Sequence, residues 1–168
     1  MAGVDFPRGF IPIKGNARTN YYQMNATHDA IGLYDLVEMR DDGCVHRAQA
    51  SSVTVIGVAA EYKAANVTGE IAVYDDPDII MEAQVDDATV SAQTDLGLAY
   101  DIVVTAPDSF GRSQMEIDGS TQATTATLPI KITRVRSVID STGNSLGTNV
   151  AVECRFNQHY FKAGSVGI

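Results

Sequence analysis

The chain has no tryptophan and few aromatic residues of any kind. Phenylalanine and tyrosine together make up 7% of its 168 residues, which is thin for a carbohydrate-binding module. No run of 18 or more apolar residues occurs, so the sequence predicts no membrane-spanning helix. The opening MAGVDFPRGF lacks a basic stretch followed by an apolar run, so no signal peptide is expected.

Cysteine is equally scarce. Cys44 and Cys154 are the only two, and they lie far apart in the sequence. A disulfide framework would need more cysteines, and a zinc site would need closer pairs. The sequence therefore predicts two free, mostly buried thiols, which fits synthesis in a reducing cytoplasm.

Positive charge is missing from the middle of the chain. Residues 64–111 contain no lysine or arginine but ten acids, and the net charge of the whole chain is −9. Such a surface repels phosphates, which argues against nucleic acid as a partner. Residues 1–28 reverse the balance, with three cations against the single acid Asp5. This asymmetry predicts one surface that meets a partner and another that faces water.

Alternating apolar residues are typical of half-buried β-strands over 78–86 and 149–161. Further strands are expected within 51–62, 70–76, 98–106 and 125–140, whereas 29–40 fits a strand or a short helix. Gly57 indicates a bulge, and Pro129 indicates an edge strand or a bulge. Turn-forming residues separate these segments. The sequence predicts an all-β fold, a single antiparallel β-barrel or sandwich domain over residues 29–168.

Residues 1–28 show no persistent period, yet they are too apolar for a plain disordered tail. We expect an extended N-terminal arm that lies on its own body, on a sister subunit or on a larger partner. The alternative is a loosely packed N-terminal strand and loop. The residues expected to make the contact are Phe6, Arg8, Phe10, Ile11, Ile13, Lys14, Arg18, Tyr21 and Tyr22.

Six carboxylates crowd the stretch AVYDDPDIIMEAQVDD at residues 72–87. Asp76 precedes a proline, which favours an extended backbone and a turn over 75–78. Along the following strand, acids four residues apart are separated by about 13 Å, too far to share one cation. The calcium-loop pattern is absent. We expect Asp75, Asp76 and Asp78 to form a solvated turn, and Glu82 and Asp86 to face water; an ion at the turn is the alternative.

No arrangement of residues indicates catalysis. The three histidines lack metal-ligand spacing, and Ser113 in GRSQM lacks the glycines of a nucleophile elbow. No phosphate-binding glycine loop occurs. We therefore expect no enzyme activity, no catalytic residue, no bound metal and no cofactor.

Several segments in a fixed order resemble a known family. They are YDDPDIIMEAQ, TDLGLAYDIV, GRSQMEID with TQATTATLPIKITRV, and RFNQHYFKAG. Together they resemble small structural proteins encoded beside the major capsid gene of tailed bacteriophages, over roughly residues 30–164. The resemblance implies a capsid decoration, or cement, protein made in the bacterial host cytoplasm.

The same resemblance implies homotrimers at local threefold positions on the outer surface of the head shell of the virion. The partner would be the major capsid protein, and the bound trimer would stabilise the shell. A second hypothesis is a head-fibre or tail module that binds a ligand on the host surface. Binding to isolated capsids, as against binding to host glycans, separates the two.

Overall fold

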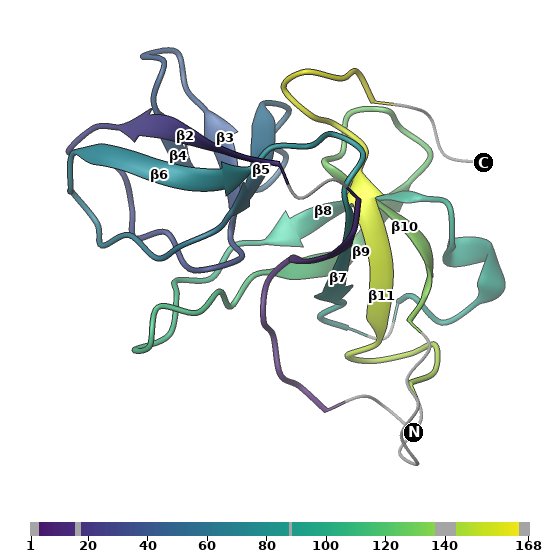
Figure 1. Cartoon of the computed structure of the whole chain (residues 1–168). Helices are drawn as coiled ribbons and strands as arrows, with labels where there is room; N and C mark the ends of the chain where they lie inside the picture. The colour runs from purple at the N-terminus through teal and green to yellow at the C-terminus, as the bar shows by residue number, and fades with distance from the viewer. Residues whose placement is uncertain (1–3, 16–17, 88, 137–143, 165–168) are drawn as a thin grey trace.

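The computed structural model describes residues 4–15, 18–87, 89–136 and 144–164 (Figure 1). These residues form two antiparallel sheets, which confirms the expected all-β fold of the sandwich type, although neither sheet is a closed barrel. The helical content of the described part is one short 3₁₀ turn, η1 (Gln93–Asp95). The segment 29–40, for which a short helix was one expectation, contains a strand instead.

The first sheet is built from a continuous part of the chain, and its strand order is β2-β6-β5-β3-β4. Its strands are β2 (Thr19–Met24), β3 (Leu36–Met39), β4 (Val45–Arg47), β5 (Val55–Ala59) and β6 (Gly69–Tyr74). The two edge strands, β2 and β4, approach each other, so the sheet curls around an apolar cluster of its own. Figure 1 shows this sheet as a lobe beside the second one.

The second sheet combines a strand from near the N-terminus with the C-terminal half, in the order β1-β7-β11-β10-β8-β9. Its strands are β1 (Ile11–Lys14), β7 (Ile80–Gln84), β8 (Ala99–Val103), β9 (Glu116–Ala123), β10 (Ile130–Val135) and β11 (Ala151–Phe156). A parallel bridge between Val85 and Ile117 joins the end of β7 to β9. This sheet therefore also curls back towards its own edge.

One apolar core joins the two sheets. Leu36, Val55 and Val58 of the first sheet pack in the same buried cluster as Met81 and Val152 of the second. The opposite face of the first sheet lines the smaller cluster inside the curl. Because β5 lies in the middle of the first sheet and is buried on both faces, it is apolar throughout rather than alternating.

The alternation expected over 78–86 and 149–161 is confirmed where it was clearest. Met81 and Ala83 of β7 are buried, as are Val152 and Cys154 of β11. The opposite faces are less exposed than expected, because Gln84, Glu153 and Asn157 are buried too. The turn after Asp76 is confirmed too, because the Ile79 amide donates to the Asp76 carbonyl at 3.2 Å. It is not the turn of a hairpin, however, since β6 and β7 belong to different sheets.

The two backbone expectations had different outcomes. Opposite β3, the register shifts beside Gly57, which confirms the bulge. A Cβ atom on Gly57 would lie 2.3 Å from the Tyr74 carbonyl oxygen, so the close approach of β6 requires glycine there. Pro129 was expected on an edge strand or at a bulge. The edge strand is wrong, because β10 lies between β11 and β8. The register of β10 does shift, but between Ile132 and Arg134, and Pro129 directly precedes the strand, where no amide is needed for the ladder.

The division of the chain at residue 28 is corrected by the structure. β1 pairs with β7, and β2 pairs with β6 along its whole length. Phe10 is fully buried in the core that joins the sheets. The described residues before position 29 are therefore part of the domain. The sequence hid this because each strand pairs with residues 45 or more positions away.

Candidate functional site: a clamped N-terminal segment

Within the described residues, no group of three or more histidine, cysteine, aspartate or glutamate side chains is placed to hold a metal ion. The feature that can carry a function is instead a surface formed by residues 4–14, which run alongside β7: β1 pairs with β7, and Val4 and Phe6 are bonded to Gln84. We call this stretch the N-terminal segment. Its outward side chains are the candidate contact site, and the side chains beneath it determine how firmly it is held.

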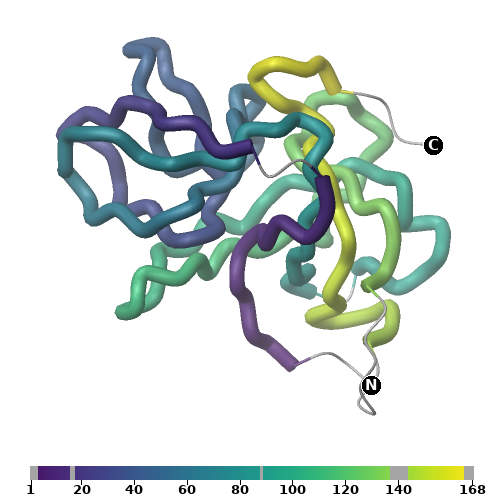
Figure 2. The backbone as a smooth tube through the Cα atoms, in the orientation of Figure 1, coloured from purple at the N-terminus to yellow at the C-terminus, as the bar shows by residue number. Residues whose placement is uncertain are grey.

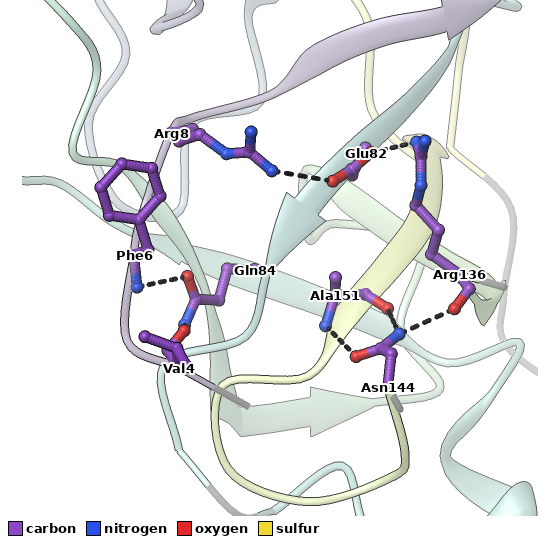
Figure 3. A network of polar contacts seen from close by, with 8 residues as sticks. All are labelled: Val4, Phe6, Arg8, Glu82, Gln84, Arg136, Asn144 and Ala151. Carbon is purple, nitrogen blue, oxygen red and sulfur yellow. Dashed lines mark hydrogen bonds and ion pairs between the residues drawn. The ribbon is translucent and has the colours of Figure 1, made fainter. Parts of the chain in front are cut away.

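Gln84, at the end of β7, fastens the beginning of this segment. Its side-chain Oε1 accepts a hydrogen bond from the Phe6 amide at 3.0 Å, and its Nε2 donates to the Val4 carbonyl at 3.1 Å. Figure 3 shows the amide lying against the segment backbone, bonded to both residues. One glutamine side chain thus does what a neighbouring β-strand would do, which is why it is buried although it is polar.

Glu82, two residues earlier on β7, forms the second fastening. Its carboxylate pairs with Arg8 at 3.3 Å and also with Arg136 (Figure 3). Arg136 is in turn braced through its backbone, because the Asn144 side chain donates to the Arg136 carbonyl at 2.8 Å. The same amide group bonds both the N–H and the carbonyl of Ala151 on β11. Glu82 is therefore largely shielded and doubly paired, whereas the sequence predicted that it would face water.

The middle of the segment enters the core. Gly9 has a φ of +70°, and a Cβ atom there would lie 2.4 Å from the Ser113 Oγ, so glycine is required. The turn at Gly9 directs Phe10 inwards, and its amide donates to the Tyr34 carbonyl at 2.9 Å. Phe10 was expected at a partner surface, but it anchors the segment internally instead.

Two apolar side chains of the clamped segment remain in solvent. The exposed fractions are 84% for Val4 and 59% for Phe6. The Arg8 guanidinium lies over the Phe6 ring, 5.7 Å from its centre, which further fixes the ring. An ordered backbone that presents unburied apolar groups is a common feature of contact surfaces.

The expected contact residues divide into three groups in the structure. Phe6, Arg8, Lys14, Arg18 and Tyr21 are exposed, Ile11, Ile13 and Tyr22 are half-buried, and Phe10 is buried. Val4 was not predicted, because a lone valine in an irregular stretch carries no periodic signal. Other exposed large apolar residues that sequence reasoning missed are Val53, Tyr62, Val67, Phe110, Tyr160 and Phe161.

Asp75 overturns the expectation of a solvated acidic turn. It is only 1% exposed, and its carboxylate accepts hydrogen bonds from Arg18 at 2.9 Å, Asn20 at 2.7 Å and Tyr22 at 2.5 Å. Burial alone would raise the pKa of Asp75, but these three donors outweigh it and lower that pKa. A signal was present in the sequence: Asn20 and Tyr22 of β2, and Arg18 just before it, occupy every second position and so share one face.

The other acids of the stretch differ in how exposed they are. Asp78 is exposed, as expected, and pairs with Lys162, while an Asp76 carboxylate oxygen accepts from the Asp78 amide at 2.9 Å as a turn does. Asp86 does not simply face water: it is half-buried and accepts from the Gly119 amide at 3.0 Å. Burial raises the pKa of Asp86, and nearby Asp87 adds to the effect.

The histidines and cysteines form no site of their own. His28 is buried, and both of its ring nitrogens lie within hydrogen-bonding distance of backbone carbonyls, at 2.6 and 2.8 Å. Both cysteines are free, and Cys154 is fully buried in the core whereas Cys44 is half-buried. The two free thiols expected from the sequence are thereby confirmed.

Comparison with known proteins adds no family assignment. No protein-family model matches the chain, and neither does any curated protein sequence or any solved structure. Across the described residues, no helix has the length and apolar character needed to cross a membrane.

Proposed function

We propose that this protein is a structural component of a tailed-bacteriophage virion that decorates the outside of the head shell and stabilises it. The observation that supports this most directly is the N-terminal segment, which is fastened by Gln84 and Glu82 while Val4 and Phe6 face solvent. The partner is the major capsid protein, and the protein is made in the bacterial host cytoplasm. The sequence motifs that resemble decoration proteins point to the same role.

The clamp explains how such a small surface can bind. Because the segment is already ordered, little conformational entropy is lost when it docks. Burial of Val4 and Phe6 contributes about 25 cal/mol for each Å² of apolar surface removed from water. β1 lies at the edge of its sheet, so a strand of the shell can add beside it. Each contact is weak, and a trimer makes three at once, so avidity holds the protein on the shell.

The charge of the molecule suits an outer surface. A net charge of −9 repels DNA, which fills the interior of a head, but it does not hinder contact with an outer protein shell. The apolar residues of the segment then supply attraction that the net charge does not.

Co-sedimentation with purified phage heads that lack this protein tests the proposal. The wild type is expected to pellet with the heads, whereas a Val4→Ser, Phe6→Ser double variant should bind at least about tenfold more weakly. Val67→Ser is a matched control, since Val67 is an exposed apolar residue on the connection between β5 and β6. Decorated heads should also withstand higher temperature than bare heads.

Three results would contradict the proposal. Wild-type protein that stays in the supernatant removes capsid binding, and equal heat resistance with and without bound protein removes the stabilising role. Binding to host cells, but not to heads, would favour a head-fibre or tail module that recognises a host ligand.

A further inference from the structure

A second surface stands out on the connection between β8 and β9. Phe110 lies there with 79% of its surface exposed, although the loop around it is tightly held. One Asp108 carboxylate oxygen accepts from the Phe110 amide at 2.9 Å and from the Arg112 amide at 2.8 Å. The Asp108 and Arg112 backbones are also bonded to each other. Phe110 is therefore presented by a preorganised turn.

This turn is attached to the β2–β3 connection of the first sheet, although β8 and β9 belong to the second sheet. The Leu33 amide donates to the Gly111 carbonyl at 2.9 Å, and the Ser113 amide donates to the Leu33 carbonyl at 3.1 Å. Gly111 has a φ of +74°, and a Cβ atom there would lie 2.6 Å from the Tyr62 ring. Tyr62 is thus packed beside the turn and is itself partly exposed.

The turn carries both an aromatic ring and a cation. The Arg112 guanidinium lies over the Phe110 ring, 5.3 Å from its centre. We call Tyr62, Phe110 and Arg112 the aromatic tip. Tyrosine, arginine and phenylalanine are enriched at interfaces, and tyrosine and arginine often dominate binding energy there. A surface that receives this tip needs an apolar floor and negative charge.

The same molecule has such a surface elsewhere. An open cleft of about 580 Å³ lies between the β3–β4 hairpin and the segment that leads into β5. Met39 and Val53 give it apolar lining, and Asp41 and Asp42 lie at the hairpin end. Its only further charges among the lining residues are Glu38 and Arg40, which pair with each other at 2.6 Å, and the ionisable His46. We call this the acidic cleft.

Exposed apolar residues continue next to the acidic cleft. Val53 is half-exposed. The Tyr160 amide donates to the Val55 carbonyl at 2.6 Å, which places Tyr160 beside the start of β5. Tyr160 and Phe161 are both exposed and pack edge to face, with ring centres 5.2 Å apart. The receiving surface is therefore wider than the cleft alone.

We propose that the aromatic tip of one copy inserts into the acidic cleft of a second copy of this chain. Phe110 covers the apolar lining, and Arg112 meets Asp41 and Asp42. Figure 2 shows the β8–β9 connection reaching past one side of the first sheet and the β3–β4 hairpin rising from the other. The tip and the cleft are different patches, so the proposed contact is head-to-tail, and it gives a closed ring such as a trimer when the rotation between neighbouring copies closes. This inference names the surfaces of the trimer in the proposed function.

Sedimentation equilibrium of the isolated protein tests the contact without any capsid. We expect concentration-dependent association, which Phe110→Ser weakens by at least about tenfold. Phe6→Ser is the matched control, since it removes an exposed phenylalanine from the N-terminal segment and should leave the association constant unchanged. Thermal melting of each variant confirms that the fold is retained.

A charge swap then tests the pairing of the two surfaces. Arg112→Glu and Asp41→Lys should each weaken association, and the double variant should recover most of it, because every tip again meets a cleft of opposite charge. Wild-type protein that stays monomeric at millimolar concentration, an unchanged constant for Phe110→Ser, or additive losses in the double variant would each overturn the proposal. Failure of capsid binding alone would not overturn this proposal, because the association is measured without heads.

Discussion

Replacing Asp75 by asparagine tests whether the acidic stretch is part of the interior. The substitution keeps the size of the side chain but removes its charge and replaces one carboxylate oxygen by an NH₂ group. Either Arg18, or Asn20 together with Tyr22, then loses its acceptor. Hydrogen bonds to a charged group contribute about 1.5–3 kcal/mol each, and breaking a buried pair costs about 3–5 kcal/mol. Arg18 is 54% exposed, so water can resolvate it after the change. We therefore expect the lower end, a loss of about 3 kcal/mol.

Urea denaturation followed by circular dichroism measures this loss. For a chain of this length, about 3 kcal/mol lowers Tm by roughly 6–12 °C. Asp78→Asn is the matched control, because Asp78 lies in the same turn but is 67% exposed, and it should cost less than about 0.5 kcal/mol. Tyr22→Phe, alone and combined with Asp75→Asn, should show coupling between the two residues, since they share a hydrogen bond.

The penalty should also depend on pH in one direction. The pKa of Asp75 is lowered in the folded protein, so its contribution is complete above the unfolded pKa near 3.8 and is lost as pH falls through the folded value. The difference between wild type and Asp75→Asn should therefore be largest at pH 6 and shrink towards pH 3. Equal losses for Asp75→Asn and Asp78→Asn at pH 6 would refute this reasoning and restore the solvated turn.

Three further measurements test other parts of the fold. Phe10→Ala should lower the free energy of unfolding, measured in urea, by about 3–5 kcal/mol, and Phe6→Ala should lower it by close to nothing, because only Phe10 is buried. Similar losses for the two variants would show that both rings are equally buried. The pKa of Glu116 is raised to about 7 by burial and by Asp5 and Asp86, so ionisation costs stability as pH rises from 4.5 to 7. Glu116→Gln should therefore raise the free energy of unfolding at pH 8 by at most about 1 kcal/mol after solvent screening, and leave it unchanged at pH 4; an equal gain at both pH values would exclude charge as the cause. Burial raises the pKa of the Cys154 thiol, so a thiol reagent should label Cys44 alone in the folded protein, and rapid labelling of two thiols would contradict the buried position.

The sequence was informative where structure depends on neighbours in the chain. Alternation predicted β7 and β11, Gly57 predicted a bulge, and Asp76–Pro77 predicted a turn. These features follow from backbone preference and from the difference between the two faces of a strand.

Pairing between distant segments was not predictable in the same way. β1 and β2 contain little alternation of apolar and polar residues, and they became strands because β7 and β6 offer edges to pair with. The burial of Asp75 likewise depends on donors from a strand 53 or more residues earlier. The exposed position of Phe110 depends on a turn that a single aspartate holds, which composition alone does not reveal.

The charge asymmetry of the chain does not simply separate a partner-facing surface from a water-facing one, as the sequence predicted. Arg8 and Arg18 pair with Glu82 and Asp75 of the same chain, so the basic N-terminal region neutralises part of the acidic middle. What the N-terminal segment offers to a partner is then chiefly apolar, through Val4 and Phe6. The aromatic tip differs, because Arg112 is proposed to meet carboxylates across an interface.

Salt should therefore separate the two proposed contacts. Ions screen exposed charge pairs, with a Debye length of about 10 Å at 0.1 M and about 3 Å at 1 M, but they leave apolar burial intact. Raising sodium chloride from 0.1 to 1 M should weaken self-association in sedimentation equilibrium. The affinity of a single copy for heads, measured by co-sedimentation, should stay nearly unchanged. Arg112→Gln controls for general salt effects, since it lacks the charge pair and its weaker self-association should change little with salt. Capsid binding that falls steeply with salt while self-association does not would show that the roles of the two surfaces have been assigned the wrong way round.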